Sequence, residues 1–192
     1  MTIRFLLPAL VGLGLLTAVR GQDAAPAPAA PAPAPAPAPE PAPPPPPKPT
    51  LSPEVAKLLP EKLIRKDGSE VSRDELAGKY VGIYFSAKWC PPCRGFTPTL
   101  VKFRNEHKDA FEVVFVSADK DLAAQKDYMT SYNMEWPAVN KDHGASKSLP
   151  QRFEVRGIPA LVILSPEGKE VTRDGRMDLQ RDYKNALAKW KK

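Results

Sequence analysis

The two cysteines of the chain, Cys90 and Cys93, stand in a Cys-Pro-Pro-Cys sequence and can interconvert between a dithiol and a disulfide. An apolar segment rich in β-forming residues, 80–85, precedes them and predicts a buried strand. Large side chains then recur at helical spacing from Phe96 to His107, which predicts an amphipathic helix. A cysteine at the start of a helix meets the positive end of the helix dipole, which favours the thiolate. The pair therefore predicts a redox site that holds a Cys90–Cys93 disulfide when oxidised.

Two other uses of a cysteine pair compete with redox chemistry. A purely structural disulfide across two intervening residues would close a very small loop and restrain little chain entropy, so a stapling role is weak. A zinc site would need further ligands, but His107 and His143 do not follow a paired zinc spacing and there is no second cysteine pair. We therefore favour redox chemistry, and we expect neither a metal nor a cofactor.

The charge of the chain argues against a nucleic-acid partner. Its 192 residues carry a formal net charge of +6, a modest surplus that is spread along the sequence. No stripe of basic residues interleaved with aromatic residues is present, as a nucleic-acid surface would require.

The first fifty residues predict export and a spacer. Residues 1–22 resemble a signal peptide, with Arg4 before an apolar run at residues 5–19 and a possible cleavage site near Gly21. That run is short for a membrane span, although an uncleaved membrane tether through residues 5–19 is the alternative. Residues 23–50 hold fourteen of the chain's 24 prolines, which excludes a helix or a sheet ladder and favours an extended linker.

Residues 51–192 are expected to form one α/β domain, with a central mixed β-sheet flanked by helices on both faces. Ser72 to Glu75 fits a capping box that starts a short helix ending near Gly78. Asp121 can cap another helix, and Asp178 is expected to begin a final helix that runs to Trp190. The expected strands are a first one around 63–64, then 80–85, 111–117, 160–164 and 170–172. Further helices are expected directly after the cysteines, at 121–133 and at 145–153. Residues 136–139 are expected to form a loop or a short strand.

This order of elements, with Trp-Cys-x-x-Cys between a strand and its helix, resembles the thioredoxin fold. The segment KYVGIYFSAKWCPPCRGFTPTL is similar to the active-site segment of the tryparedoxin and nucleoredoxin branch of the thioredoxin superfamily. The resemblance extends from about Leu58 to Arg176, and the string WCPPCRGFTP is highly specific.

The resemblance implies a role for each residue of the candidate site. Cys90 would be the attacking thiolate and Cys93 the resolving thiol, with Trp89 packed beside them. Pro98 would kink the active-site helix. Pro159 matches the cis-proline of the family and would leave the backbone of Ile158 free to pair with a substrate strand.

The first thiol is expected to be exposed at the edge of its helix, and Cys93 to be shielded one turn inside. Pro91 and Pro92 remove two amide donors that could have stabilised the Cys90 thiolate, and Lys88 could offset part of that loss. A moderately lowered pKa of the Cys90 thiol would favour a reductant or a balanced exchanger over a strong oxidant.

Three departures from the family pattern limit what the resemblance implies. Tyr84 occupies the position where many thioredoxins carry a buried acid. Residues 117–120 read Ser-Ala-Asp-Lys where tryparedoxins usually have Ser-Trp-Asp-Glu. These two changes leave the proton acceptor for Cys93 unidentified. Ala160 replaces the threonine that usually follows the cis-proline, and the Phe-Pro-Trp ending is absent. Trypanothione is therefore not carried over as a partner.

These features predict an exported, periplasmic or extracytoplasmic thiol–disulfide oxidoreductase that acts as a monomer. Its partners would be a protein or small-molecule disulfide and an unidentified thiol electron donor. Two alternatives remain open: a dedicated reductase for apocytochrome c or another single client, and a tethered binding module whose cysteine pair only regulates it.

Overall fold

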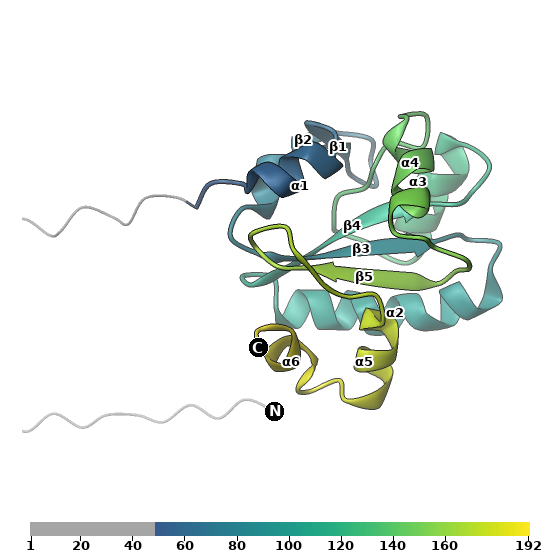
Figure 1. Ribbon diagram of the computed structural model, residues 1–192. Coiled ribbons are helices and arrows are strands. Elements are labelled where there is room, and N and C mark those ends of the chain that lie inside the picture. Colours follow the sequence, from purple (N-terminus) through teal and green to yellow (C-terminus); the bar gives the residue numbers. More distant parts are fainter. Residues whose placement is uncertain (1–48) are drawn as a thin grey trace, which may run out of the picture. The chain divides into compact units, whose positions relative to one another are not determined.

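The structure, a computed structural model, describes residues 49–192 (Figure 1). The signal peptide or anchor expected at residues 1–22 and the linker expected at 23–50, apart from its last two residues, lie outside the described residues. In chain order the elements are α1 (Pro53–Leu58), β1 (Lys62–Ile64), β2 (Glu70–Ser72), the 3-10 turn η1 (Arg73–Leu76), β3 (Tyr80–Ser86), α2 (Pro91–Glu106), β4 (Phe111–Ser117), α3 (Leu122–Ser131), α4 (Ala145–Arg152), β5 (Ala160–Leu164), β6 (Glu170–Thr172), α5 (Gly175–Arg181) and α6 (Ala186–Trp190).

A mixed sheet with strand order β4-β3-β5-β6 forms the centre, as the sequence predicts. β3 pairs with β4 in parallel and with β5 antiparallel, and β6 is the antiparallel return strand of a hairpin. Phe85 lies opposite Ala160, and Ser86 lies opposite Ser117. The carboxyl ends of β3 and β4 and the start of β5 therefore lie together at one end of the strands, where α2 also begins (Figure 1).

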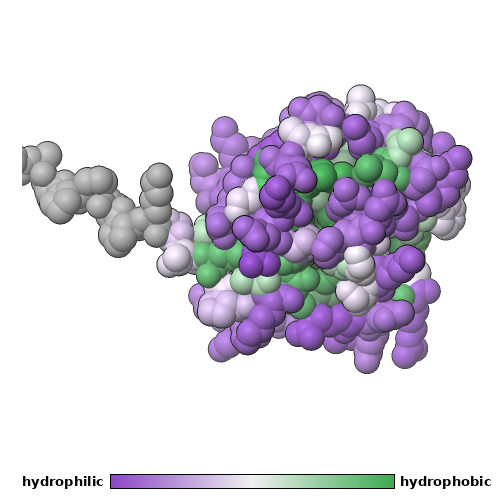
Figure 2. All heavy atoms as spheres, turned by 90° about the horizontal axis from the view of Figure 1, so that it is seen from above, coloured by the Kyte–Doolittle hydropathy of each residue, from purple (hydrophilic) through white to green (hydrophobic). Residues whose placement is uncertain are grey.

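Helices cover both faces of the sheet, because β3, β4 and β5 are apolar on both sides. On one face, side chains of α2, α5 and α6 pack against Tyr84, Phe115 and Ile163. On the other face, α1, β1 and α4 cover Ile83, Val114 and Val162. Figure 2 looks onto the side of α1 and α4, where hydrophilic residues predominate and hydrophobic residues show in smaller patches.

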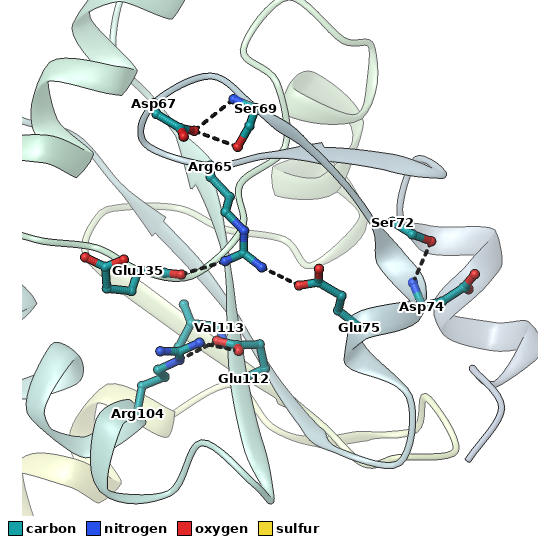
Figure 3. A network of polar contacts seen from close by, with 10 residues as sticks. All are labelled: Arg65, Asp67, Ser69, Ser72, Asp74, Glu75, Arg104, Glu112, Val113 and Glu135. Carbon is teal, nitrogen blue, oxygen red and sulfur yellow. Dashed lines mark hydrogen bonds and ion pairs between the residues drawn. The ribbon is translucent and has the colours of Figure 1, made fainter. Parts of the chain in front are cut away.

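The predicted capping box is wrong, although Ser72 does cap a turn. The Ser72 hydroxyl accepts a hydrogen bond from the Asp74 amide at 3.1 Å, but only the 3-10 turn η1 follows. A capping box would need the Glu75 carboxylate to turn back to Ser72. Glu75 instead binds the Arg65 guanidinium at 2.5 Å (Figure 3), so a contact between distant segments replaces the local one.

The predicted single helix from Asp178 to Trp190 is also wrong. The segment forms α5 and α6, and Asp178 lies inside α5. Its buried carboxylate accepts a hydrogen bond from Trp190 Nε1 at 2.9 Å and pairs with the Lys189 ammonium. In a straight helix, residues twelve apart would be separated by about 18 Å along the axis. The chain therefore has to turn between the two helices for these contacts to form.

A nearly buried ion pair ties the end of α2 to β4. Arg104 donates two hydrogen bonds to the Glu112 carboxylate, at 2.7 and 2.6 Å, and the Val113 amide donates a third at 3.0 Å (Figure 3). The bonds to Glu112 raise the pKa of the Arg104 guanidinium. This contact fixes the far end of the helix whose first turn carries the cysteines.

Within residues 49–192, no helix is both long and apolar enough to cross a bilayer.

Candidate active site

The two cysteines lie at the start of α2, close to the carboxyl end of the central strand β3. They form a disulfide, with their Cα atoms 5.2 Å apart. Cys90 is the N-cap residue of α2, and its sulfur accepts a hydrogen bond from the Cys93 amide at 3.3 Å. Pro91 and Pro92 occupy the first two helical positions and have no amide hydrogen to donate. The Cys93 amide is therefore the donor at this helix start that reaches the Cys90 sulfur.

The Cys90 residue is less exposed than its position at the helix start suggests. Its exposed fraction is 4%, against 0% for Cys93. Cys90 is more exposed than Cys93, which agrees with the sequence-based expectation. The expectation that the first cysteine is open and exposed is wrong. Ala87 and the partly buried Ile158 pack against the two cysteines and cover most of their surface. Little of the Cys90 surface is therefore left for a substrate to contact.

The loop before β5 forms the second wall of the site. The Ile158–Pro159 peptide bond is cis, as the resemblance implies. The carbonyl oxygen of Ile158 lies 3.8 Å from the Cys90 sulfur. Neither the amide nor the carbonyl group of Ile158 makes a backbone hydrogen bond within residues 49–192. These groups are therefore placed to pair with another extended segment beside the disulfide.

Trp89 and Lys88 are held in place from β4 and α3. The Trp89 side chain is 65% exposed, and its indole nitrogen donates to the Ala118 carbonyl at 3.3 Å. The Lys88 ammonium bonds to Asp127 at 2.5 Å and to Ser131 at 3.2 Å. Lys88 is thus engaged with α3, so its charge is directed there and not to the Cys90 sulfur.

Asp119 is a positioning residue that the sequence analysis missed. It is 3% exposed, and its carboxylate accepts hydrogen bonds from the Lys88 amide at 2.9 Å and from the Ser117 hydroxyl at 2.8 Å. The bond to Lys88 ties the loop just before Cys90 to the end of β4. A carboxylate two residues after the end of a buried strand was the available signal, but its partner Lys88 is 31 residues away in the chain.

Four buried hydroxyl groups lie beneath Cys93, where many thioredoxins carry an acid. Tyr84, Ser86, Thr97 and Tyr128 are all fully buried. The Tyr84 and Thr97 oxygens are 2.8 Å apart, and the Tyr128 oxygen is 2.7 Å from Thr97 and 3.1 Å from Ser86. Thr97 donates to the Cys93 carbonyl at 2.9 Å. The cluster fixes the first turn of α2 through neutral hydrogen bonds instead of a charge.

Burial raises the pKa of the Tyr84 hydroxyl well above its usual value of 10.0, and the neighbouring Tyr128 adds to this effect. Because the pKa is higher in the folded than in the unfolded chain, the folded state holds this proton more tightly. The stabilisation is complete below about pH 10 and falls above it, by about 1.4 kcal/mol per pH unit.

We expect Tyr84→Phe to flatten the loss of stability between pH 10 and 12, as measured by urea denaturation at a series of pH values. The variant also loses a buried hydrogen-bonding group at neutral pH, so the slope and not the absolute free energy of unfolding is compared. An unchanged slope would show that Tyr84 does not hold its proton in this way.

Cys90 is expected to react first when the reduced protein meets iodoacetamide. Cys90 lies at the helix start and is 4% exposed, whereas Cys93 is fully buried. Mass spectrometry after brief labelling at neutral pH locates the modified residue, and Cys93→Ser is the control that keeps the reactive thiol alone. Earlier modification of Cys93 would reverse the assigned roles.

Comparisons with known proteins agree with this architecture. The family model described as thioredoxin-like matches residues 78–170. The chain is 40% identical to nucleoredoxin of Mus musculus over 124 residues, which are 62% of this chain and 28% of the relative. For nucleoredoxin of Xenopus laevis the identity is 43% over 124 residues, 62% of this chain and 30% of the relative. The chain thus spans less than a third of the length of these relatives.

Two solved structures match over nearly their whole length. Tryparedoxin of Trypanosoma brucei aligns with a TM-score of 0.64 and 38% identity, covering 71% of this chain and 97% of that one. Thioredoxin of Wuchereria bancrofti aligns with a TM-score of 0.61 and 36% identity, covering 69% and 95%. A further similar structure is a tryparedoxin II complexed with glutathionylspermidine.

Proposed function

The chain belongs to the thioredoxin superfamily, in its tryparedoxin- and nucleoredoxin-like branch, and on that premise we propose that it is an exported thiol–disulfide oxidoreductase acting on protein disulfides through Cys90 and Cys93. The observation that carries the proposal is the position of the cysteine pair at the N-terminus of α2, beside Ile158, whose backbone groups make no backbone hydrogen bond within residues 49–192. The relatives in this branch are thiol–disulfide oxidoreductases.

The exchange takes place in two steps. In the first, the Cys90 thiolate attacks one sulfur of the substrate disulfide and forms a mixed disulfide, and one substrate thiolate leaves. In the second, the Cys93 thiolate attacks the Cys90 sulfur and releases the other substrate sulfur as a thiolate. The substrate gains two electrons and its thiolates take up protons, while the enzyme is left with the Cys90–Cys93 disulfide. An external thiol donor then returns the pair to the dithiol.

The geometry supports each step. The helix start and the Cys93 amide stabilise a negative charge on the Cys90 sulfur. The hydroxyl cluster and α2 hold Cys93 within disulfide reach of Cys90, so the second attack requires little movement. The Ile158 backbone offers an amide and a carbonyl to an extended substrate beside the reacting sulfur.

Export is part of the same proposal and rests on the sequence. Residues 1–22 would direct the chain out of the cytoplasm, either as a cleaved signal or as a membrane tether through residues 5–19. Residues 23–50 would hold a monomeric domain away from the membrane. Fractionation of expressing cells, with sequencing of the mature N-terminus, tests export and cleavage together; recovery of the uncleaved chain in the cytoplasm would contradict it.

Insulin reduction driven by dithiothreitol tests the activity. An oxidoreductase should reduce many equivalents of insulin, because dithiothreitol returns the Cys90–Cys93 pair to the dithiol after each cycle. Stoichiometric trapping without turnover would indicate a redox-regulated binding module, and turnover limited to one client would indicate a dedicated reductase.

A further inference from the structure

Two hollows flank the exposed Trp89 side chain. The first has a volume of about 420 Å³ and lies between Trp89 and the loop that carries Ile158. The second, about 440 Å³, lies on the side of Lys88 and Lys120. Trp89 and Ala118 line both hollows. The hydrogen bond from the Trp89 indole nitrogen to the Ala118 carbonyl holds the ring between the two hollows.

The first hollow combines an apolar lining with an unbalanced positive charge. Phe85, Val116, Val155 and Ile158 contribute apolar surface and Lys141 and Arg156 contribute the charges. No carboxylate from the described part of the chain, residues 49–192, lines this hollow. The Lys141 ammonium donates to the Ser117 carbonyl at 3.0 Å, which places it at the wall formed by the end of β4. This hollow is therefore suited to a group that carries both hydrocarbon and negative charge.

The cations around the site differ in how they are balanced. Lys88 is paired with Asp127, and Arg173, near β6, is paired with Glu154 and Glu170. Arg156 is exposed and forms no ion pair within residues 49–192. Lys141 has a carbonyl partner but makes no ion pair within residues 49–192. The positive charge of the first hollow is thus available to a ligand.

The hollow is close to the reacting sulfur. Ile158 lines it, and the Ile158 carbonyl oxygen is 3.8 Å from the Cys90 sulfur. Arg156 precedes Ile158 by two residues, which corresponds to at most about 7 Å of extended backbone. A side chain in the hollow would therefore belong to a residue close in sequence to the substrate cysteine.

We propose that the first hollow binds an acidic side chain of a client polypeptide, within a few residues of the client's disulfide cysteine, and so selects disulfides flanked by Asp or Glu. This inference rests on the proposed function. The client segment would lie extended along the Ile158 backbone, its aliphatic carbons covering the apolar lining and its carboxylate facing Arg156 and Lys141. A small disulfide without a peptide chain would leave the apolar lining uncovered.

The test compares two disulfide peptides that differ only in Glu or Gln two residues from the cysteine. We expect the kcat/KM for the Glu peptide to be about fivefold higher at low salt, since an exposed ion pair contributes up to about 1 kcal/mol. The preference should shrink in 0.5 M salt. Arg156→Gln should remove it. Arg152→Gln should retain it, because Arg152 is an exposed arginine at the end of α4 that does not line this hollow.

Small disulfides separate the possible outcomes. Arg156→Gln should change the rate of hydroxyethyl disulfide reduction less than it changes the rate with the Glu peptide. Equal rates for the Glu and Gln peptides, with normal turnover of both, would overturn the inference and leave the proposed function standing. An effect of Arg156→Gln that is as large with dithiodipropionate as with the peptides would overturn the assignment of the hollow to a polypeptide.

If no disulfide is turned over, the proposed function fails, and binding decides the inference separately. Peptides with serine in place of cysteine are then titrated onto the oxidised protein, and the change in tryptophan fluorescence is followed. Tighter binding of the Glu peptide that Arg156→Gln abolishes would support the hollow as an acidic-peptide site, and equal binding of both peptides would overturn it.

Discussion

Cys90→Ser is expected to lower the rate of insulin reduction by roughly three orders of magnitude or more, to that of the protein-free reaction. The one thiol that remains in this variant is that of Cys93, which is fully buried, so it is not placed to attack the substrate. A serine hydroxyl at the same helix start is far less acidic than a thiol and forms no disulfide. Steady-state turnover with dithiothreitol as the donor measures the effect.

Cys93→Ser should fail differently, which makes it the matched control. Cys90 still attacks the substrate, but the mixed disulfide has no internal thiol to resolve it. The variant should therefore accumulate a covalent adduct with insulin, visible on a non-reducing gel, while the double variant should form none. Residual turnover of Cys90→Ser above background would contradict the assignment of Cys90 as the nucleophile.

Phe103→Ala is expected to destabilise the domain by about 3–5 kcal/mol. Phe103 is fully buried on the inner side of α2, and its ring centroid lies 5.4 Å from those of Phe111 and Tyr183 and 5.5 Å from that of Trp190. Alanine would leave a cavity where α2, β4, α6 and the segment before α6 meet. Urea denaturation measures the free energy of unfolding.

Phe103→Leu fills most of that space and should cost only about 1 kcal/mol. The dependence of the free energy on urea should be unchanged in both variants if they unfold in one step. A loss below about 1 kcal/mol for Phe103→Ala would show that the aromatic cluster does not anchor the cysteine helix to the sheet.

The strands and the position of the cysteines could be predicted from local patterns. β4 forms at residues 111–117 as predicted, because a run of seven buried residues rich in β-formers has no alternative of helical length. The Asp121 cap of α3 also agrees with the prediction, since its carboxylate accepts from the Ala124 amide three residues on. The mixed sheet follows from the order of these elements along the chain.

Two of the failed predictions share one cause. The capping box at Ser72 and the single helix after Asp178 are local signals, and side chains from elsewhere outcompete them. Glu75 binds Arg65, ten residues away, and Asp178 binds Trp190 across a turn of the chain. At Asp178, a propensity of a few tenths of a kcal/mol per residue is weaker than the buried hydrogen bond that the carboxylate accepts from Trp190.

The sequence by itself determined which two atoms can carry the redox chemistry, because thiols three residues apart at a helix start need no long-range information to be placed together. Only the tertiary structure decided what surrounds them. The Tyr128 hydroxyl contacts that of Ser86, 42 residues away in the chain. Arg156 and Lys141 line the same hollow, and Ile158 packs against the two cysteines. Such contacts depend on how the strands pair and how the helices pack, and no local spacing in the chain specifies either.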